Sequence, residues 1–595
     1  MTQTNDAKLR RRRAFATVLR HLRRYRSRLA LGGLALAVTN LALLLNPWIL
    51  KVTIDELEEG LSERRLLMYA AAFVGVTAFS GIFRFLMRRI MIGVSRKIEY
   101  DIRGEFFAHL ETLSPAFYNK HRTGDLMALA TNDLNAVRAM VGPGVMYSLN
   151  TVVVGSLAIS LMVVLSWKLT VAALMPMGIL VVGMYHSMKL IHKYFEKVQE
   201  RFAGLNSRAQ ENLSGIRVVR AYARECHEID EFDRLSQVYV GANMKLYRVQ
   251  SLLSPLLTSV AGLGGLLILG YGGKQVIDGV ITLGTFVAFN GYLTMLIWPM
   301  IALGWVMNIM ERGLASMQRI NAVMTTRTEI IDRGLDGGDL PRPESRAIRF
   351  ENVSFSYDPA GGRDDVLEDL SFAIGDGETV AIVGPTGSGK STVVSLMLRL
   401  YEPQRGQVFV GEVPVRDIAL GELRTLVGLI PQDIFLFSET IAENVAFGVA
   451  SLEAPELDRV SRLAAIDDEV HGFPEGYETR IGERGINLSG GQKQRLAIAR
   501  ALARSPQILI MDDALSSVDT DTEDRILRSL REEMEKRTSI LISHRISTVR
   551  EADRILVLDA GRLVEQGTHD ELVAAGGLYA EMFRKQSIMY SLERS

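Results

Sequence analysis

The chain has 595 residues, too many for one domain, and 48% of them are hydrophobic, enough for large cores or for crossing a bilayer. Its 68 basic and 68 acidic residues balance, so the composition argues against nucleic acid as a partner. The single cysteine, Cys226, excludes a disulfide within the chain and suits a reducing compartment.

Residues 1–28 are predicted to form a basic amphipathic elbow helix. Phe15, Val18, Leu19 and Leu22 recur there at helical spacing among arginines, a pattern typical of a helix lying on an anionic membrane surface. A disordered basic tail is the alternative.

Residues 29–320 are predicted to be an all-α membrane domain with six spans, because a helix needs roughly 20 apolar residues to cross a ~30 Å hydrocarbon core. Two long charged linkers, 84–138 and 189–248, are predicted to form helical hairpins outside the membrane. Six spans and a basic N-terminus place both termini in the cytosol. The charge-free stretches are Leu29–Leu50, Met68–Phe83 (running on past Arg84), Ala139–Trp167, Leu169–Met188, Val249–Gly273 and Ile281–Met310.

Residues 321–345, rich in charge, glycine and proline, are predicted to be a linker. In residues 346–595, short β-rich runs alternate with helical segments, which predicts an α/β domain with a largely parallel sheet. The predicted strands are Thr379–Val383, Gln407–Val410, Val427–Ile430, Ile508–Met511, Ser539–Ile542 and Arg554–Leu558.

A glycine-rich loop, GPTGSGKS, lies between the first long predicted strand and a helical run. Such a loop cradles phosphates with its backbone N–H groups, while its lysine reaches the β and γ phosphates and its last serine binds Mg²⁺. The sequence therefore predicts a P-loop ATPase domain that binds ATP and Mg²⁺. The loop and the first residue after it are Gly384, Pro385, Thr386, Gly387, Ser388, Gly389, Lys390, Ser391 and Thr392.

Two further motifs complete the predicted site. Asp512 ends an apolar strand, where a carboxylate can hold Mg²⁺ opposite the loop. The sequence LSGGQ precedes a helix, so Ser489, Gly490, Gly491 and Gln492 present donors suited to a phosphate. The natural source of that phosphate is ATP held by the loop of a facing subunit.

The order of these motifs resembles the nucleotide-binding domain of ATP-binding cassette (ABC) proteins, and with six preceding spans the chain resembles a half-size exporter of that family. The resemblance implies that Tyr357 stacks on adenine, that Gln432 contacts Mg²⁺, and that His544 lies near the γ-phosphate as a catalytic switch. It also implies that Ser516–Asp519 crosses the dimer interface. Glu483, Arg484 and the hairpin tips Ser114–Leu126 and Glu211–Glu225 match segments that link the membrane domain to the cassettes.

The chain departs from the family at Asp513, where Glu usually polarises the attacking water. Losing one methylene withdraws the carboxylate by over ~1 Å, and a misplacement of that size lowers a rate by about a hundredfold. Lys390, Gln432, Asp513 and His544 are thus the predicted catalytic set, with Asp513 making this chain's own site slow. Such an Asp beside an intact LSGGQ resembles the degenerate subunit of a bacterial heterodimeric multidrug-type exporter.

The resemblance thus implies ATP-driven export of hydrophobic or amphipathic, drug- or lipid-like substrates by a dimer in a bacterial inner membrane. Its expected partners are a second ABC half-transporter, membrane lipid and a small hydrophobic substrate. A homodimeric lipid or peptide exporter with slow hydrolysis, and an ATP-binding regulatory subunit, remain as alternatives. Aromatic and methionine residues in the spans suit variable apolar ligands, although helix packing also explains them. They are Tyr147, Tyr185, Met295, Trp298, Met300, Trp305 and Met307.

Overall fold

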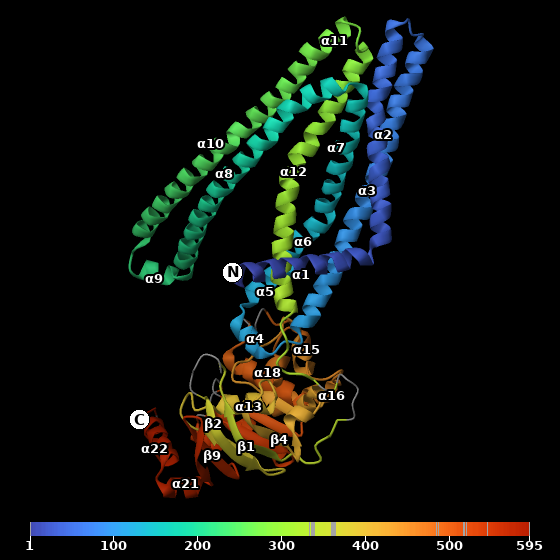
Figure 1. Ribbon diagram of the computed structural model, residues 1–595. Helices are drawn as coiled ribbons and strands as arrows, with labels where there is room; N and C mark the ends of the chain where they lie inside the picture. The colour runs from blue at the N-terminus through green and yellow to red at the C-terminus, as the bar shows by residue number, and fades with distance from the viewer. Residues whose placement is uncertain are drawn as a thin grey trace. The chain divides into compact units, whose positions relative to one another are not determined.

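The computed structural model describes the chain apart from residues 1, 333, 335–339, 359–364, 483–484, 486, 516–517, 519, 544 and 594–595, and apart from some side chains within its helices. It divides into two compact units (Figure 1). The membrane unit comprises Met1–Glu111 and Thr123–Thr326, and the cassette unit comprises Thr112–Arg122 and Arg327–Ser595.

The membrane unit is entirely helical. Its long helices follow the charge-free segments and extend into the charged linkers, since few glycines or prolines interrupt those linkers. The long helices are α1 (Thr2–Arg24), α2 (Arg26–Glu58), α3 (Glu63–Leu110), α7 (Val145–Leu165), α8 (Trp167–Ser214), α10 (Glu225–Leu267) and α12 (Leu283–Met324). The short ones are α5 (Thr123–Ala128), α6 (Leu134–Ala139), α9 (Ile216–Ala221) and α11 (Gly273–Ile277), and π-helical turns lie at Leu129–Asp133, Met140–Gly144 and Ile268–Gly272.

Four helical segments among the described residues are long and apolar enough to cross a membrane. They are Arg26–Glu58, Glu63–Leu110, Thr123–Leu165 and Leu283–Met324. The other two predicted spans lie on α8 and α10, where several side chains fall outside the described residues.

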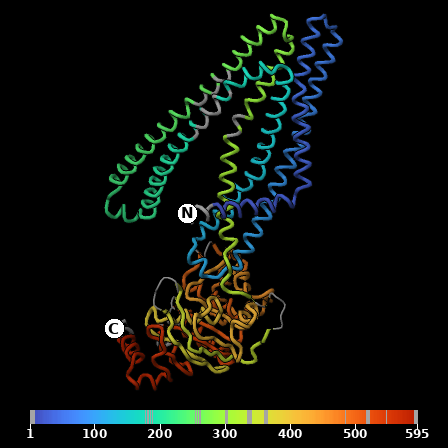
Figure 2. The backbone as a smooth tube through the Cα atoms, viewed as in Figure 1, coloured from blue at the N-terminus to red at the C-terminus, as the bar shows by residue number. Residues whose placement is uncertain are grey.

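Helices α2, α3, α7 and α12 pack together, whereas α8 and α10 run side by side as a long hairpin closed by α9 (Figures 1 and 2). Buried residues such as Ala158, Phe289 and Tyr292 fill the bundle where α7, α8 and α12 meet. The hydroxyl of Tyr292 donates to the backbone oxygen of Leu44 over 2.9 Å, so the largest buried side chain on α12 is hydrogen-bonded to α2. Helix α1 packs on α12, with Asn321 donating to Thr17 over 3.1 Å.

The cassette unit contains two sheets. A six-stranded sheet has the order β10-β9-β3-β8-β7-β6 and is parallel except for β10, and an antiparallel sheet has the order β2-β1-β4-β5. The strands are β1 (Ile348–Phe355), β2 (Leu367–Ile374), β3 (Thr379–Val383), β4 (Arg405–Val410), β5 (Val413–Pro414), β6 (Val427–Ile430), β7 (Ile508–Asp512), β8 (Thr538–Ile542), β9 (Arg554–Asp559) and β10 (Arg562–Gly567). The predicted α/β fold is confirmed, and the antiparallel sheet is an addition to it.

Two apolar cores cover the two faces of the six-stranded sheet. Side chains alternate along β3, so that Val380 and Ile382 enter one core while Ala381 and Val383 enter the other. Helix α13 (Lys390–Met397) packs in the first core, together with the antiparallel sheet, and α18 (Gly490–Ala503) packs in the second. The helices that follow the two glycine motifs therefore cover opposite faces of one sheet.

The remaining helices of the cassette unit are short, apart from α19 and α22. They are α4 (Pro115–Lys120), α14 (Leu420–Leu426), α15 (Ile441–Ala446), α16 (Ala454–Leu463), α17 (Asp467–His471), α19 (Thr520–Glu535), α20 (Ile546–Val549), α21 (His569–Ala575) and α22 (Leu578–Glu593), with 3₁₀ turns at Val415–Asp417 and Gly476–Glu478.

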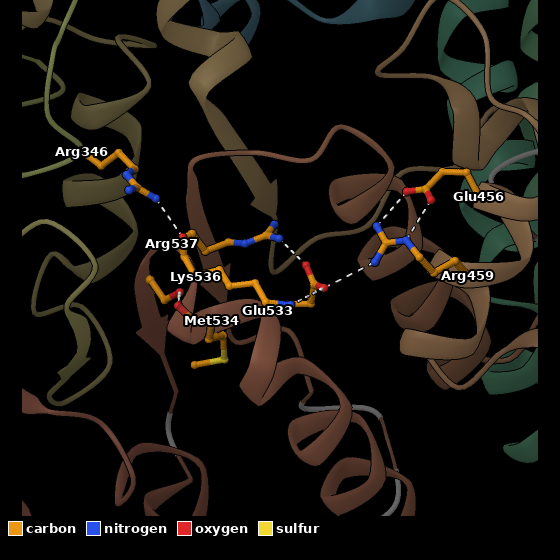
Figure 3. Close-up of polar contacts among 8 residues, drawn as sticks. Arg346, Glu456, Arg459, Glu533, Met534, Lys536 and Arg537 are labelled. Carbon is orange, nitrogen blue, oxygen red and sulfur yellow. Dashed lines mark hydrogen bonds and ion pairs between the residues drawn. The ribbon is translucent and has the colours of Figure 1, made fainter.

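An ion-pair network joins α16 to the end of α19 (Figure 3). Arg459 contacts Glu456 at 2.7 Å and Glu533 at 3.4 Å, and Arg537 pairs with the same Glu533. Glu533 is largely shielded from water, so these pairs are screened less than surface pairs. Arg346, just before β1, donates to the backbone oxygen of Lys536 over 2.8 Å. The network thus fixes α16 and the start of the β1 segment against α19.

The α4 segment belongs to the cassette unit although it lies between α3 and α5 in the chain. Pro115 starts the helix, where its missing N–H would have no partner anyway. Phe117 is buried and stacks on His121 with ring centroids 4.1 Å apart. Asn119 donates to the hydroxyl of Tyr401 over 2.9 Å, and Ser114 donates to Glu329 over 3.2 Å. The tip of the first predicted hairpin therefore packs on the cassette.

Candidate nucleotide site

The glycine-rich loop follows β3 and turns directly into α13. Gly384, Gly387 and Gly389 have φ values of 153°, 85° and 98°, a region that L side chains rarely adopt. A Cβ at Gly384 would lie 2.0 Å from the backbone oxygen of Leu558, and one at Gly389 would lie 2.5 Å from Leu367. The loop thus needs glycine for both conformation and space. Pro385, Thr386 and Gly387 are exposed, and Ser388 is buried.

Lys390 is the first residue of α13 and its side chain folds back over the loop. The ammonium donates to the backbone oxygens of Gly384 and Pro385 over 2.9 and 2.8 Å. Burial lowers the pKa of Lys390, while the carboxylates of Asp512 and Asp513 act in the opposite direction. The cation therefore sits between the loop and these two acids, where it can meet an incoming phosphate.

The other predicted residues lie at the same edge of the sheet. Parallel register along β3, β8, β7 and β6 brings their carboxyl ends together. Asp512 is the last residue of β7 and is buried, while Gln432 follows β6 and is exposed. His544 follows β8 but lies outside the described residues, as do Glu483, Arg484, Ser516 and Asp519.

Asp513 has a left-handed backbone, with φ 48°. Asp adopts this region more readily than most residues, and such conformations gather at functional sites. Its N–H donates to the backbone oxygen of Ile542 over 2.8 Å, which ties the turn after β7 to the end of β8. The side chain is half-buried.

The donors at this edge suit Mg²⁺. Ser391 supplies an exposed hydroxyl, Asp512 a carboxylate and Gln432 an amide oxygen, all hard ligands. Among the described residues, no group of three or more His, Cys, Asp or Glu side chains could hold a metal ion. These few donors fit a Mg²⁺ ion that is held partly by the protein and partly by the phosphates of a bound nucleotide.

Tyr357 lies beside the loop on the antiparallel-sheet side. Its hydroxyl is 3.1 Å from the hydroxyl of Thr392 on α13, and its ring meets Tyr401 edge-on at 5.1 Å. The ring is 43% exposed, which leaves part of its surface for a ligand. The structure thus places an accessible aromatic ring next to the phosphate loop.

The LSGGQ motif forms the N-terminus of α18. Ser489 caps the helix by accepting from Gln492 N over 3.2 Å, and Gln492 accepts from Ser489 N over 2.9 Å. Gln492 also donates to Glu469, which binds Arg495 on the next turn. Ser489 and Gly490 are exposed, and Gly491 is half-buried. The capped helix end is thus held rigidly and faces outward.

Comparisons with known proteins agree with this geometry. A family model described as "ABC transporter transmembrane region" matches residues 29–300, and one described as "ABC transporter" matches residues 367–516. The chain is 38% identical to the probable multidrug resistance ABC transporter ATP-binding/permease protein YheI of Bacillus subtilis, over 96% of this chain and 97% of YheI. The chain belongs to the ABC transporter family.

This ABC exporter is also similar to the multidrug resistance-like ATP-binding protein MdlA of Escherichia coli, with 36% identity over 96% of each chain. It is 32% identical to the ATP-dependent lipid A-core flippase of Syntrophus aciditrophicus, over 91% of this chain and 89% of the flippase. The solved structure of a bacterial Atm1-family ABC exporter with ATP bound matches with a TM-score of 0.78 and 32% identity, covering 94% of this chain and 98% of that one. The fold is that of an ATP-driven exporter.

Two residues that the sequence did not reveal hold segments that adjoin predicted site residues in the chain. Arg500 on α18 donates to the backbone oxygens of Phe435 and Asn444 over 2.9 and 2.8 Å, which holds the loop after Gln432. Glu523 on α19 is buried, pairs with Arg545 and accepts from Thr548 over 2.7 Å, which holds the segment after β8. Both contacts join segments far apart in the chain, so no local pattern could have indicated them.

Proposed function

We propose that this chain is the slowly hydrolysing half of a heterodimeric ABC exporter for hydrophobic or amphipathic compounds. Asp513 carries the proposal. Its short side chain extends from a turn that is fixed to β8, so the backbone cannot easily advance to make up for the missing methylene. Lys390, Asp512, Ser391 and Gln432 would still bind ATP and Mg²⁺.

The exposed LSGGQ end supports the dimeric part of the proposal. It begins α18, which packs on the opposite face of the sheet from α13 and the phosphate loop. Its donors are capped and ordered, yet the backbone N–H groups at the helix start remain available for an anion. In a head-to-tail dimer this motif would complete the partner's site, where most turnover takes place. The multidrug names of two relatives support the substrate class.

Steady-state ATPase measurements on the chain alone and with its coexpressed partner test the proposal. Asp513→Asn should lower the rate of the complex by less than about twofold, because the other site turns over. Ser489→Ala should nearly abolish it, since an anion at a helix N-terminus loses a charge-assisted contact. Asp513→Glu should raise the rate of the lone chain by up to about a hundredfold.

Asp570→Asn, an exposed acid on α21, is the control and should leave every rate unchanged. Brisk hydrolysis by the lone chain that is lost in Asp513→Asn would contradict the heterodimer and identify a homodimer with Asp513 as its base. ATP binding by the lone chain without any turnover, even in Asp513→Glu, beside brisk turnover by the complex would instead identify a regulatory subunit whose partner performs the turnover.

A further inference from the structure

A cavity of about 260 Å³ lies within the membrane unit, among α2, α3, α7 and α12. Its lining combines two kinds of side chain. Arg84, Arg88, Asn40 and Asn150 are polar, and no Asp or Glu lines the cavity among the described residues. Met87, Met146, Tyr147, Met295 and Trp298 are among the apolar and aromatic residues that line it.

The cavity lies at the level of the middle of one predicted span. Asn40 is about midway along the charge-free segment of α2, roughly 16 Å from either end at 1.5 Å per residue. Arg84 and Arg88 line the same cavity, which indicates that the span on α3 runs on past both arginines. Asn40 donates to the amide oxygen of Asn150 over 3.1 Å, and Asn40 is 3% exposed. This hydrogen bond holds the two amides in place, and among the described residues the amide nitrogen of Asn150 has no acceptor, so it can donate to a ligand.

The two arginines lie on the same face of α3, since residues four apart in a helix are neighbours. The described part of the chain offers neither guanidinium an ion pair, although nearby arginines such as Arg96 and Arg103 pair with Glu99. A charged side chain at membrane depth is costly without a partner and usually marks a functional site. Two neighbouring arginines that have no ion pair among the described residues therefore line one cavity, an arrangement that suits an anion.

We propose that this cavity recognises an amphipathic anion, with its charged group between Arg84 and Arg88 and its apolar body against Trp298, Met146 and Met295. The inference deepens the export function proposed above and rests on it. Arginine suits this role because its planar fork binds carboxylate, sulfonate or phosphate oxygens in pairs. A cationic amphiphile of the same size would be repelled.

Binding of a fluorescent fatty acid tests the site. The purified exporter complex in nanodiscs of zwitterionic lipid is titrated with dansyl-undecanoic acid and with its uncharged methyl ester. The acid should bind at least about tenfold more tightly, the effect expected for a charged hydrogen-bonded pair. The double change Arg84→Gln with Arg88→Gln should remove the preference, whereas Arg84→Lys with Arg88→Lys should retain part of it.

Arg89→Gln is the matched control, because Arg89 lies on the same helix and is exposed, as Arg84 and Arg88 are, but does not line the cavity. Equal binding of acid and ester, or a preference that survives the double Gln change, would overturn the proposal and leave the arginines as anchors to lipid phosphates. The binding measurement needs no ATP turnover, so a failure of the export function alone would not alter it.

The same assay distinguishes two sources of the anion. If phosphatidylglycerol added to the nanodiscs displaces the acid from the wild-type exporter but has no effect in the double Gln variant, the ligand comes from the bilayer. If the acid binds unchanged, the ligand is a free amphiphile from the aqueous phase. Either result supports a site for amphipathic anions.

Discussion

Lys390 shows how one side chain orders the phosphate loop. Its ammonium is shared between two loop carbonyls and lies near the carboxylates of Asp512 and Asp513. Because burial has already removed most of its hydration, the ammonium gives up little water when phosphate oxygens replace the carbonyls. The loop is therefore ordered before its ligand arrives.

Removing this cation should weaken nucleotide binding. We expect Lys390→Ala to lower the affinity for ATP by about 10- to 100-fold, the effect of losing one charged hydrogen-bonded contact. Fluorescent-nucleotide titration of the purified exporter measures it, with Lys585→Ala on the exposed face of α22 as the control. An unchanged affinity in Lys390→Ala would show that the loop does not hold the nucleotide phosphates.

Among single residues, the sequence predicted those members of the candidate site that belong to short contiguous motifs. The phosphate loop, Asp512 and LSGGQ are contiguous motifs whose chemistry depends on neighbouring residues. Arg500 and Glu523 were not predicted because their partners lie 56 and 25 residues away and only folding brings them together. The left-handed turn at Asp513 was also not predicted, since Asp adopts it without any glycine to mark it.

Among the elements, α18 connects the LSGGQ motif to the loop that follows Gln432. Its N-terminus presents LSGGQ, and three turns later Arg500 reaches the loop after Gln432 and the end of α15. Burial between these segments lowers the pKa of Arg500, and its guanidinium also lies over the ring of Phe447 at 5.7 Å. A movement of α18 would therefore displace the loop after Gln432 directly, through the hydrogen bonds of Arg500.

Replacing the guanidinium group of Arg500 should weaken the link between α18 and the loop after Gln432. Arg500 also donates to the side-chain oxygen of Asn444 over 2.9 Å, which makes three hydrogen bonds in all. Arg500→Lys keeps the charge but cannot make all three, so we expect a local loss of about 1–3 kcal/mol. Hydrogen exchange should then speed up at residues 435–446. Arg504→Lys, whose bond to Thr425 is exposed, should have little effect, and unaltered exchange in Arg500→Lys would refute the connection.

The elements themselves were predictable in proportion to their burial. Strands β3, β7, β8 and β9 are runs of apolar residues because parallel strands are covered on both faces, and all four were predicted. Strands β1, β2 and β10 were missed, because each includes exposed positions and a Glu, and β10 has no fully buried residue. Their pairing depends on partners far along the chain, which no local period reveals.

At the scale of the whole molecule, the α8–α10 hairpin is the feature that indicates an interaction with a second chain. The helix at its tip, α9, buries none of its residues; Val218 within it is 61% exposed and Tyr222 directly after it is 76% exposed. Exposed apolar side chains gathered at one tip mark an interaction site. This agrees with the expectation that the tip docks on a cassette, and ABC exporters function as dimers.

A photoreactive amino acid at Val218 should therefore form a covalent product with another half-transporter. Mass spectrometry of that product would distinguish a second copy of this chain from a different subunit. Val564, similarly exposed on β10, provides the control position and should give no such product. If neither position is captured by a second transporter chain, the tip does not dock in this way.

Cys226, at the start of α10, is exposed and is the chain's single cysteine. Any maleimide dye or nitroxide added to the native chain will consequently attach at one place, near the tip of the α8–α10 hairpin. The wild-type exporter is thus ready for spectroscopic distance measurement without engineering. In a homodimer, paired spin labels would report how far apart the two arms stand with and without ATP. In a heterodimer, the same label would provide a single fixed reference point.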